Sequence, residues 1–172
     1  MGASNRERLH AECLRIEEDT IFSAKTLLND AERLAWRAKY VQRGTGLIGG
    51  LTAMIAGGAA ALGISPKTAA VVAAAGGFAS VASNAFKYDD QAQKARSSGN
   101  AYLGLNKRVR FYRQIELPLA KDAQAETARV KGFIEDNIQI QQQAPECYFP
   151  DSWTRARDGI RDGETEYSVD KK

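Results

Sequence analysis

Few side chains in this sequence could perform acid–base, nucleophilic or metal chemistry. The only histidine is His10, and the two cysteines, Cys13 and Cys147, lie far apart. A catalytic triad or a histidine-based metal site needs a histidine, and zinc sites with paired cysteines need short Cys spacings. We therefore expect no catalytic residue, no metal site, no cofactor and no enzymatic activity. Two cysteines outside any disulfide framework favour a reducing compartment.

One glycine motif has the spacing of a nucleotide-binding turn but not its context. Gly44, Gly46 and Gly49 match the GxGxxG pattern of dinucleotide-binding proteins. That turn needs a preceding strand and an acidic residue about twenty positions later. Here a basic, helical segment precedes Gly44, and no acid occurs between Glu32 and Asp89. The motif therefore does not predict a nucleotide site.

A basic segment in the second half allows two interpretations. Four cations alternate with two aromatic residues: Lys107, Arg108, Arg110 and Arg113 with Phe111 and Tyr112. Such a segment could bind phosphates or single-stranded nucleic acid. It could equally be a solvated helix face or contact lipid headgroups. The net charge of only +3 favours the second interpretation, and we do not expect nucleic acid as a partner.

The main feature of the chain is a pair of uncharged stretches, residues 44–66 and 68–86, divided by Lys67. Each is near the ~20 residues that cross a ~30 Å hydrocarbon core as a helix. A single charge at the centre of a span would cost about 2.5–3.5 kcal/mol, so its absence favours insertion into a bilayer. The stretches predict a transmembrane hairpin over 44–86. The alternative is a soluble bundle with an Ala/Gly-rich central hairpin.

The connection and the flanking charges predict how this hairpin is oriented. Gly63 can end the first helix, Ser65 can cap the second, and Pro66 suits its first position. Cations flank the hairpin on the side of the termini: Arg37, Lys39, Arg43 and Lys87. By the positive-inside rule, both termini are cytoplasmic and this juncture lies at the inner face of the membrane.

Small residues recur at every fourth position in the predicted spans. The rows are Gly49, Ala53, Gly57 and Ala61; Gly46, Gly50 and Gly58, with Met54 at the intervening fourth position; and Ala69, Ala73 and Gly77. Such rows let helix backbones approach closely and drive association in lipid. Two rows on the first helix indicate contacts within the hairpin and with other subunits, which predicts a homo-oligomer. The alternative is that a composition rich in Ala and Gly produces such spacings by chance.

Four polar residues lie at membrane depth in this interpretation: Thr52, Ser80, Ser83 and Asn84. They can bond to another helix or to their own backbone. Alternatively, they face a pore and are its candidate lining.

The flanking segments predict an amphipathic stalk. Apolar or small residues recur in steps of three and four at Leu9, Cys13, Ile16, Thr20, Ala24, Leu27, Ala31, Leu34, Ala38 and Val41. A second stripe comprises Tyr88, Ala92, Ala95, Gly99, Tyr102, Asn106, Val109 and Tyr112. Because the hairpin is antiparallel, the two stripes can pair as a coiled coil.

The expected fold is all-α, with a transmembrane hairpin that continues into a cytoplasmic antiparallel helical stalk and one further C-terminal helix. Its parts are an amphipathic helix over 1–43, the hairpin over 44–86 and a returning helix over 87–117 that Pro118 ends. A C-terminal helix over 119–143 is expected to use Leu119, Ala123, Val130, Ile134 and Ile138. Residues 144–172 read as a partly disordered tail in which Tyr148, Phe149 and Trp153 dock.

This order of elements resembles a known family. The resemblance covers roughly residues 5–140 and rests on Phe22 to Leu28, Arg43, both uncharged stretches, Ala101-Tyr102-Leu103 and Phe111-Tyr112. The chain is similar to the SLATT family, the two-transmembrane effector domains associated with SMODS and SLOG proteins. The resemblance implies a bacterial inner-membrane effector of conflict systems, activated by a nucleotide-generating or nucleotide-sensing protein partner.

We therefore expect an oligomeric effector that forms a pore or disrupts the membrane during anti-phage defence, with the lipid bilayer as its surroundings. The competing hypothesis is a non-conducting two-span anchor or scaffold that recruits a cytoplasmic partner.

Overall fold

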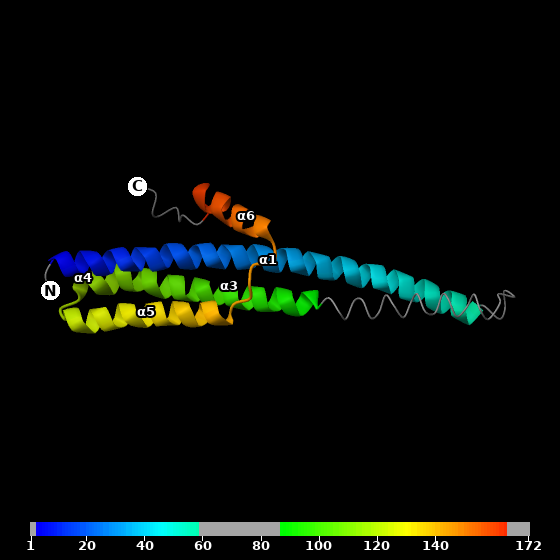
Figure 1. Ribbon diagram of the computed structural model, residues 1–172, viewed down its shortest axis with the longest axis horizontal. Helices are drawn as coiled ribbons and strands as arrows, with labels where there is room; N and C mark the ends of the chain where they lie inside the picture. The colour runs from blue at the N-terminus through cyan, green and yellow to red at the C-terminus, as the bar shows by residue number, and fades with distance from the viewer. Residues whose placement is uncertain (1–2, 59–86, 165–172) are drawn as a thin grey trace. The chain divides into compact units, whose positions relative to one another are not determined.

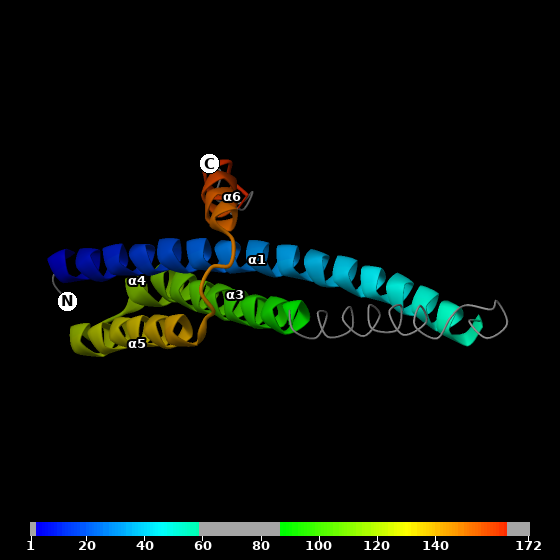
Figure 2. The same ribbon diagram turned by 45° about the vertical axis from the view of Figure 1, so that its right-hand side comes forward.

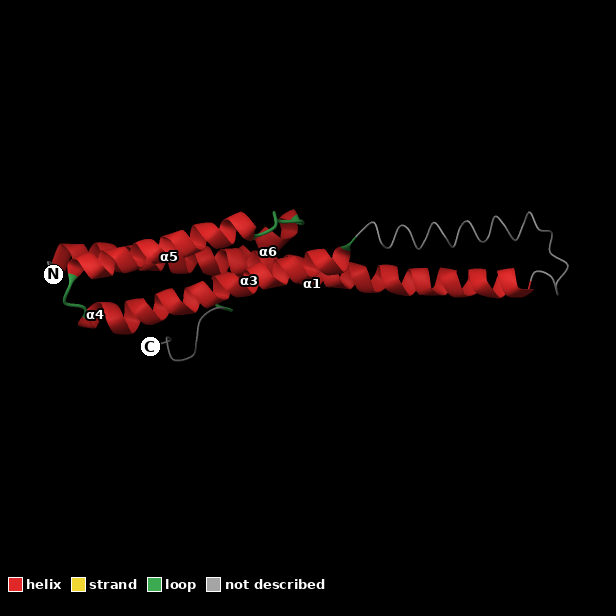
Figure 3. Cartoon of the chain, turned by 90° about the horizontal axis from the view of Figure 1, so that it is seen from below, coloured by secondary structure: helices red, strands yellow, loops and turns green. Residues whose placement is uncertain are grey.

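The computed structural model describes residues 3–58 and 87–164, and within these ranges every regular element is helical (Figure 3). The predicted all-α class is confirmed for this part of the chain. The elements are α1 (Ala3–Gly58), α3 (Tyr88–Phe111), a π-helical turn η1 (Tyr112–Glu116), α4 (Leu117–Leu119), α5 (Ala123–Gln143) and α6 (Pro150–Arg161).

The chain divides into two compact units. The bundle unit comprises the residues up to Ala31 together with those from Gln93 onward, and the second unit comprises Glu32–Ala92. Helices α1 and α3 each pass from one unit into the other, so they are the two covalent connections between them.

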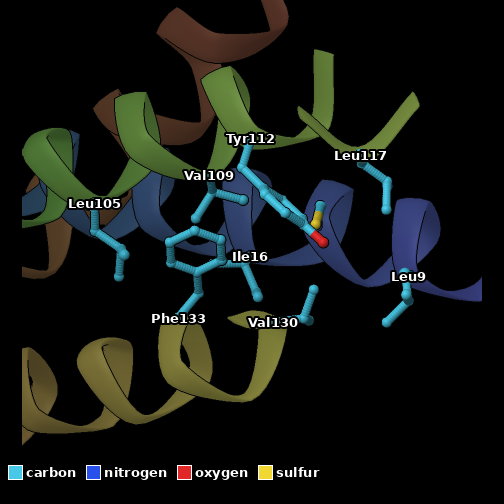
Figure 4. Close-up of a cluster of buried hydrophobic side chains, with 9 residues drawn as sticks. Leu9, Ile16, Leu105, Val109, Tyr112, Leu117, Val130 and Phe133 are labelled. Atoms are coloured by element: carbon cyan, nitrogen blue, oxygen red, sulfur yellow. The ribbon is translucent and has the colours of Figure 1, made fainter. Parts of the chain in front are cut away.

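In the bundle unit, α1, α3 and α5 lie side by side (Figures 1 and 2). Leu9, Cys13 and Ile16 of α1 form one hydrophobic core with buried side chains from α3, η1, α4 and α5: Leu105, Val109, Tyr112, Leu117, Val130 and Phe133. The rings of Tyr112 and Phe133 meet edge to face with centroids 5.4 Å apart (Figure 4). Aromatic pairs in this geometry stabilise a core beyond their buried area.

The burial of both predicted stripes is confirmed. Every member of the first is buried except Val41, which is partly buried. In the second, Tyr88 and Asn106 are partly buried and the others are buried. Leu9 and Cys13 share a cluster with Val109 and Tyr112, whereas Ala24 and Leu27 share one with Tyr102, so α1 and α3 run antiparallel in this unit.

The end of the returning helix differs in detail from the prediction. The α-helical pattern stops at Phe111, and one π-helical turn carries the chain to α4, where the N–H of Leu117 donates to the carbonyl of Tyr112. Pro118 has no N–H and cannot continue the ordinary i→i−4 ladder. A wider turn before the proline is consistent with that loss, and the helix ends at Leu119.

The next helix begins later than predicted and buries another face. Asp122 caps α5 by accepting a hydrogen bond from the N–H of Gln124, so residues 119–122 lie outside this helix. Leu119 is 76% exposed and Ile138 is also exposed, whereas Phe133 is buried. The predicted phase was wrong at these positions because α1 and α3 together determine which face of α5 is covered.

The predicted tail contains a helix, α6. Pro150 occupies its first turn, and Gly163, with φ of 81°, closes its C-terminal end through backbone bonds from Gly163 to Ile160 and from Glu164 to Gly159. The helix is amphipathic, with Trp153, Ala156 and Ile160 recurring in steps of three and four, and its buried residues are the small Ser152, Ala156 and Gly159. Residues 165–172 lie outside the described residues.

Candidate functional site

The uncharged part of the chain is described only in part. Helix α1 continues through the predicted boundary at residues 43–44 to Gly58, so one helical backbone carries both the stalk stripe and the first small-residue rows. Six of the row residues and one polar residue lie on it: Gly46, Gly49, Gly50, Ala53, Gly57, Gly58 and Thr52. Their side chains are not described.

The remaining predicted hairpin residues lie outside the described residues. They are Ala61, Gly63, Ser65, Pro66, Ala69, Ala73, Gly77, Ser80, Ser83 and Asn84. The predicted span over 44–66 is thus covered only to Gly58, and the span over 68–86 is not covered. Within residues 3–58 and 87–164, no helix is long and apolar enough to cross a bilayer.

An exposed aromatic pair precedes the uncharged stretch. Trp36 and Tyr40 are 57% and 61% exposed, and their ring centroids lie 5.3 Å apart on α1. The sequence analysis missed this pair. The sequence feature that could have revealed it is that Trp36 and Tyr40 are four residues apart and both lie outside the stripe that contains Leu34 and Ala38. Trp and Tyr on an outward helix face are typical of a lipid–water interface.

Exposed cations surround this pair in the sequence. Arg37, Lys39 and Arg43 are all exposed on α1. Lys87, the fourth predicted juncture residue, is exposed and lies immediately before α3 with φ of 40°. Its backbone carbonyl accepts a hydrogen bond from the N–H of Gln91. We define the juncture as Trp36, Arg37, Lys39, Tyr40, Arg43 and Lys87. Its chemistry combines amphipathic rings with positive charge.

The bundle unit holds a closely spaced, partly buried ion pair. The guanidinium of Arg113 donates to both carboxylate oxygens of Glu17, at 2.6 and 3.1 Å, and lies 3.4 Å from the ring of His10. Arg108 pairs with Asp136 at 2.9 Å, and Tyr112 is buried with its hydroxyl on Glu126 at 2.6 Å. The basic segment is therefore divided among several partners and does not form one phosphate-binding patch.

Helix α6 docks on α1 through polar and aromatic contacts. The backbone N–H of Tyr148 donates to the buried carboxylate of Asp30 at 2.7 Å, and the amide of Asn29 donates to the carbonyl of Ser152 at 3.3 Å. Trp153 meets Phe22 edge to face at 5.5 Å. The docking expected for this segment is confirmed, although Tyr148 uses its backbone rather than its ring.

A groove of about 620 Å³ runs between α1 and α3 in the same unit. Its walls are mainly apolar, from Leu14, Ile21 and Leu28 of α1, Leu103 of α3 and Ile160 of α6. Charged side chains edge it: Glu17, Glu18, Lys25, Lys107, Arg110 and Glu164. We call it the α1–α3 groove. Cations and carboxylates both edge it, so it does not have the single-sign lining of a site for a small anion.

The two thiols differ in accessibility. Burial, with the nearby Glu17 carboxylate, raises the pKa of Cys13 to about 11. Cys147 is exposed, and partial burial raises its pKa from the ordinary value. Among the described residues, no group of three or more His, Cys, Asp or Glu side chains could hold a metal ion.

We predict that one thiol reacts in the folded protein. A small maleimide at pH 8 is expected to modify Cys147 and to leave Cys13 unmodified, because the Cys13 side chain is buried and protonated at that pH. Intact-mass spectrometry measures this as one adduct, rising to two in denaturant. The Cys147→Ser variant is the control and should take up none when folded. Rapid addition of a second adduct to the folded wild type would contradict the prediction.

Among the described residues, the juncture combines exposed aromatic rings with positive charge and is the candidate site. Comparisons of the chain with models of known families, with curated proteins and with solved structures found no significant match.

Proposed function

We propose that this chain is an integral protein of the bacterial inner membrane. Residues 44–86 form the transmembrane hairpin, both termini are cytoplasmic, and the flanking helices form the cytoplasmic stalk. The observation that carries the proposal is the exposed Trp36–Tyr40 pair among cations, directly before the uncharged stretch begins. No other described segment combines these features so close to an uncharged run.

The spacing of this pair suits a bilayer surface. Tyr40 precedes Gly44 by four residues, which is about 6 Å along a helix. The headgroup layer on each side of the hydrocarbon core is roughly 5–7 Å thick. With Gly44 at the edge of the core, the Tyr40 ring lies among the headgroups, and Arg37 and Lys39 face the cytoplasmic surface, where anionic lipids attract cations.

The proposed activity is that of an oligomeric effector in anti-phage defence, which opens or disrupts the membrane after a nucleotide-signalling partner activates it. Three observations support it: the resemblance to the SLATT family, the small-residue rows and the uninterrupted course of α1 from Ala3 to Gly58. A continuous helix can transmit a change in stalk packing to the span. In the resting state, subunit packing occludes Thr52, Ser80, Ser83 and Asn84, and activation exposes them.

The alternative function is a non-conducting membrane anchor that recruits a partner through the stalk. The half-exposed apolar side chains of Phe111 and Ile115 on the returning helix favour this alternative, because they are available to bind another protein.

Substitution in a small-residue row tests the effector proposal. Induced expression of the wild type is expected to depolarise cells loaded with a membrane-potential dye. Gly57→Leu should weaken this roughly tenfold, because a large side chain in such a row prevents close helix packing, and overpacking typically costs about 1–3 kcal/mol. The matched control is Gly104→Leu, since Gly104 is exposed and a Cβ atom added there would meet nothing within 4 Å. Equal depolarisation by both variants would reject the role of this row.

Dye-filled liposomes separate the two functions. Purified full-length protein that inserts, oligomerises and releases the dye supports the effector. Protein that inserts and oligomerises without release, even after a cytoplasmic extract from infected cells is added, supports the anchor instead.

A further inference from the structure

The α1–α3 groove is an apolar surface that the bundle unit does not fill. α5 covers a different face of α3, through Leu105 and Val109, and the groove lies on the side lined by Leu103, Asn106 and Lys107. Leu14 of α1 is among the exposed large apolar side chains, and Ile21 and Leu28 are only partly buried. Apolar side chains between two adjacent helices are the usual seat of a further helix.

The two edges of the groove carry opposite charges that the described residues leave uncompensated. Glu18 on α1 and Lys107 on α3 are exposed, and neither belongs to an ion pair within residues 3–58 and 87–164. Their neighbours in the groove are paired: Glu17 with Arg113 and Lys25 with Glu164. Along α1 the groove therefore presents the carboxylate of Glu18 outside any ion pair among the described residues, and along α3 it presents the cation of Lys107, with Arg110 one turn away.

The register of the two helices places these charges at the same height. The amide of Asn106 donates to the carbonyl of Glu17 at 2.7 Å and to the hydroxyl of Thr20 at 3.0 Å. Glu18 is the residue after Glu17 on α1, and Lys107 is the residue after Asn106 on α3. Glu18 and Lys107 thus lie at about the same height on the two helices that line the groove.

We propose that the α1–α3 groove is the interface between two copies of this chain, related by a twofold axis parallel to α1. Rotation about such an axis exchanges the two edges, so Glu18 of each copy meets Lys107 of the other at the same height. The apolar walls of the two grooves face one another, and the two α1–α3 pairs form a four-helix bundle.

The direction of the axis rests on the proposed membrane function. α1 leaves the bundle unit at Ala31 and α3 enters it at Gln93, near the same end. An axis parallel to α1 keeps this end on the same side in both copies, so that both predicted hairpins enter one bilayer. An axis perpendicular to α1 would direct them to opposite sides.

Charge reversal in separate chains tests the interface. Glu18→Lys and Lys107→Glu should each weaken self-association of the full chain in detergent micelles roughly tenfold. Each homodimer then contains two like-charged contacts in place of two attractive ones. Analytical ultracentrifugation across a dilution series measures this effect. Lys131→Glu, an equal change at an exposed site on α5, is the control and should leave self-association unchanged.

Mixing the two variants tests directly whether the contact joins two chains. A Glu18→Lys chain paired with a Lys107→Glu chain has both contacts attractive again, so the mixture should regain association to within about threefold of the wild type. A contact inside one chain, or an indirect effect on folding, would not be rescued by mixing. Single variants that associate like the wild type, or a mixture that does not recover, would overturn the proposal.

Membrane fractionation of the same variants keeps this proposal separate from the proposed function. All of them should sediment with membranes as the wild type does, because neither charge lies in the predicted spans. If the wild type stays in the soluble fraction, the membrane function fails, while recovery in the mixture still decides whether the groove is the interface.

Discussion

Replacing Ile55 with arginine is expected to remove most of the chain from the membrane fraction. Ile55 lies near the middle of the first predicted span. A charge at the centre of a span costs about 2.5–3.5 kcal/mol, which corresponds to roughly a hundredfold change in the insertion equilibrium. The apolar residues of this span are few, and its many Ala and Gly residues add little, so the remaining side chains cannot offset that cost.

The measurement is the fraction of protein that resists extraction of membranes with alkaline carbonate. Gln142→Arg adds the same charge at an exposed position of α5 and should leave this fraction unchanged. If the Ile55→Arg chain is retained as well as the control, the hairpin interpretation is wrong, and the soluble bundle with a central Ala/Gly-rich hairpin becomes the better description.

The second large effect is expected in the stalk, where Arg113→Ala should destabilise the bundle unit by about 3–5 kcal/mol. The side chains of Arg113 and Glu17 are only 16% and 14% exposed, and they form a two-point ion pair. Removing the guanidinium leaves the carboxylate of Glu17 largely out of water without its counter-charge. At about 2–4 °C per kcal/mol for a chain of this size, the midpoint of thermal unfolding should fall by roughly 6–20 °C.

Circular dichroism of the full chain in micelles measures this shift. Arg15→Ala removes a comparable guanidinium from Glu12, but that pair is 74% and 36% exposed, so less than about 1 kcal/mol should be lost. Replacing both members of the buried pair, as Glu17→Gln with Arg113→Met, should recover part of the loss because no unpaired charge remains. Equal shifts for Arg113→Ala and Arg15→Ala would show that the buried pair contributes little.

Much of the helical architecture can be predicted from local patterns. The stripe from Leu9 to Ala38 repeats in steps of three and four, and a helix with that period can cover only one continuous face. Its burial is confirmed, as is that of the returning stripe from Ala92 to Tyr112. The predicted juncture cations Arg37, Lys39, Arg43 and Lys87 are exposed, and their place at a membrane surface stays a prediction. The functional predictions that rest on residues 44–86 remain predictions.

Other features depended on partners that a local pattern does not contain. α6 is amphipathic, but the residues that hold it and the preceding Tyr148 in place, Asp30, Asn29 and Phe22, lie more than a hundred residues earlier in the chain. On α5, Phe133 is buried instead of Ile138, because the covered face is the one that meets two other helices at once.

By itself, the sequence determined the helical class, the two buried stripes and the division into charged stalk segments and an uncharged centre, since each follows from the period or composition of neighbouring residues. Only the tertiary structure decided that Arg113 pairs with Glu17, that Trp36 and Tyr40 stay exposed, and that Glu18 and Lys107 line the same groove. The physical reason is that the charge or apolar area of a side chain is a local property. Whether it is neutralised or covered depends on which distant element packs against it.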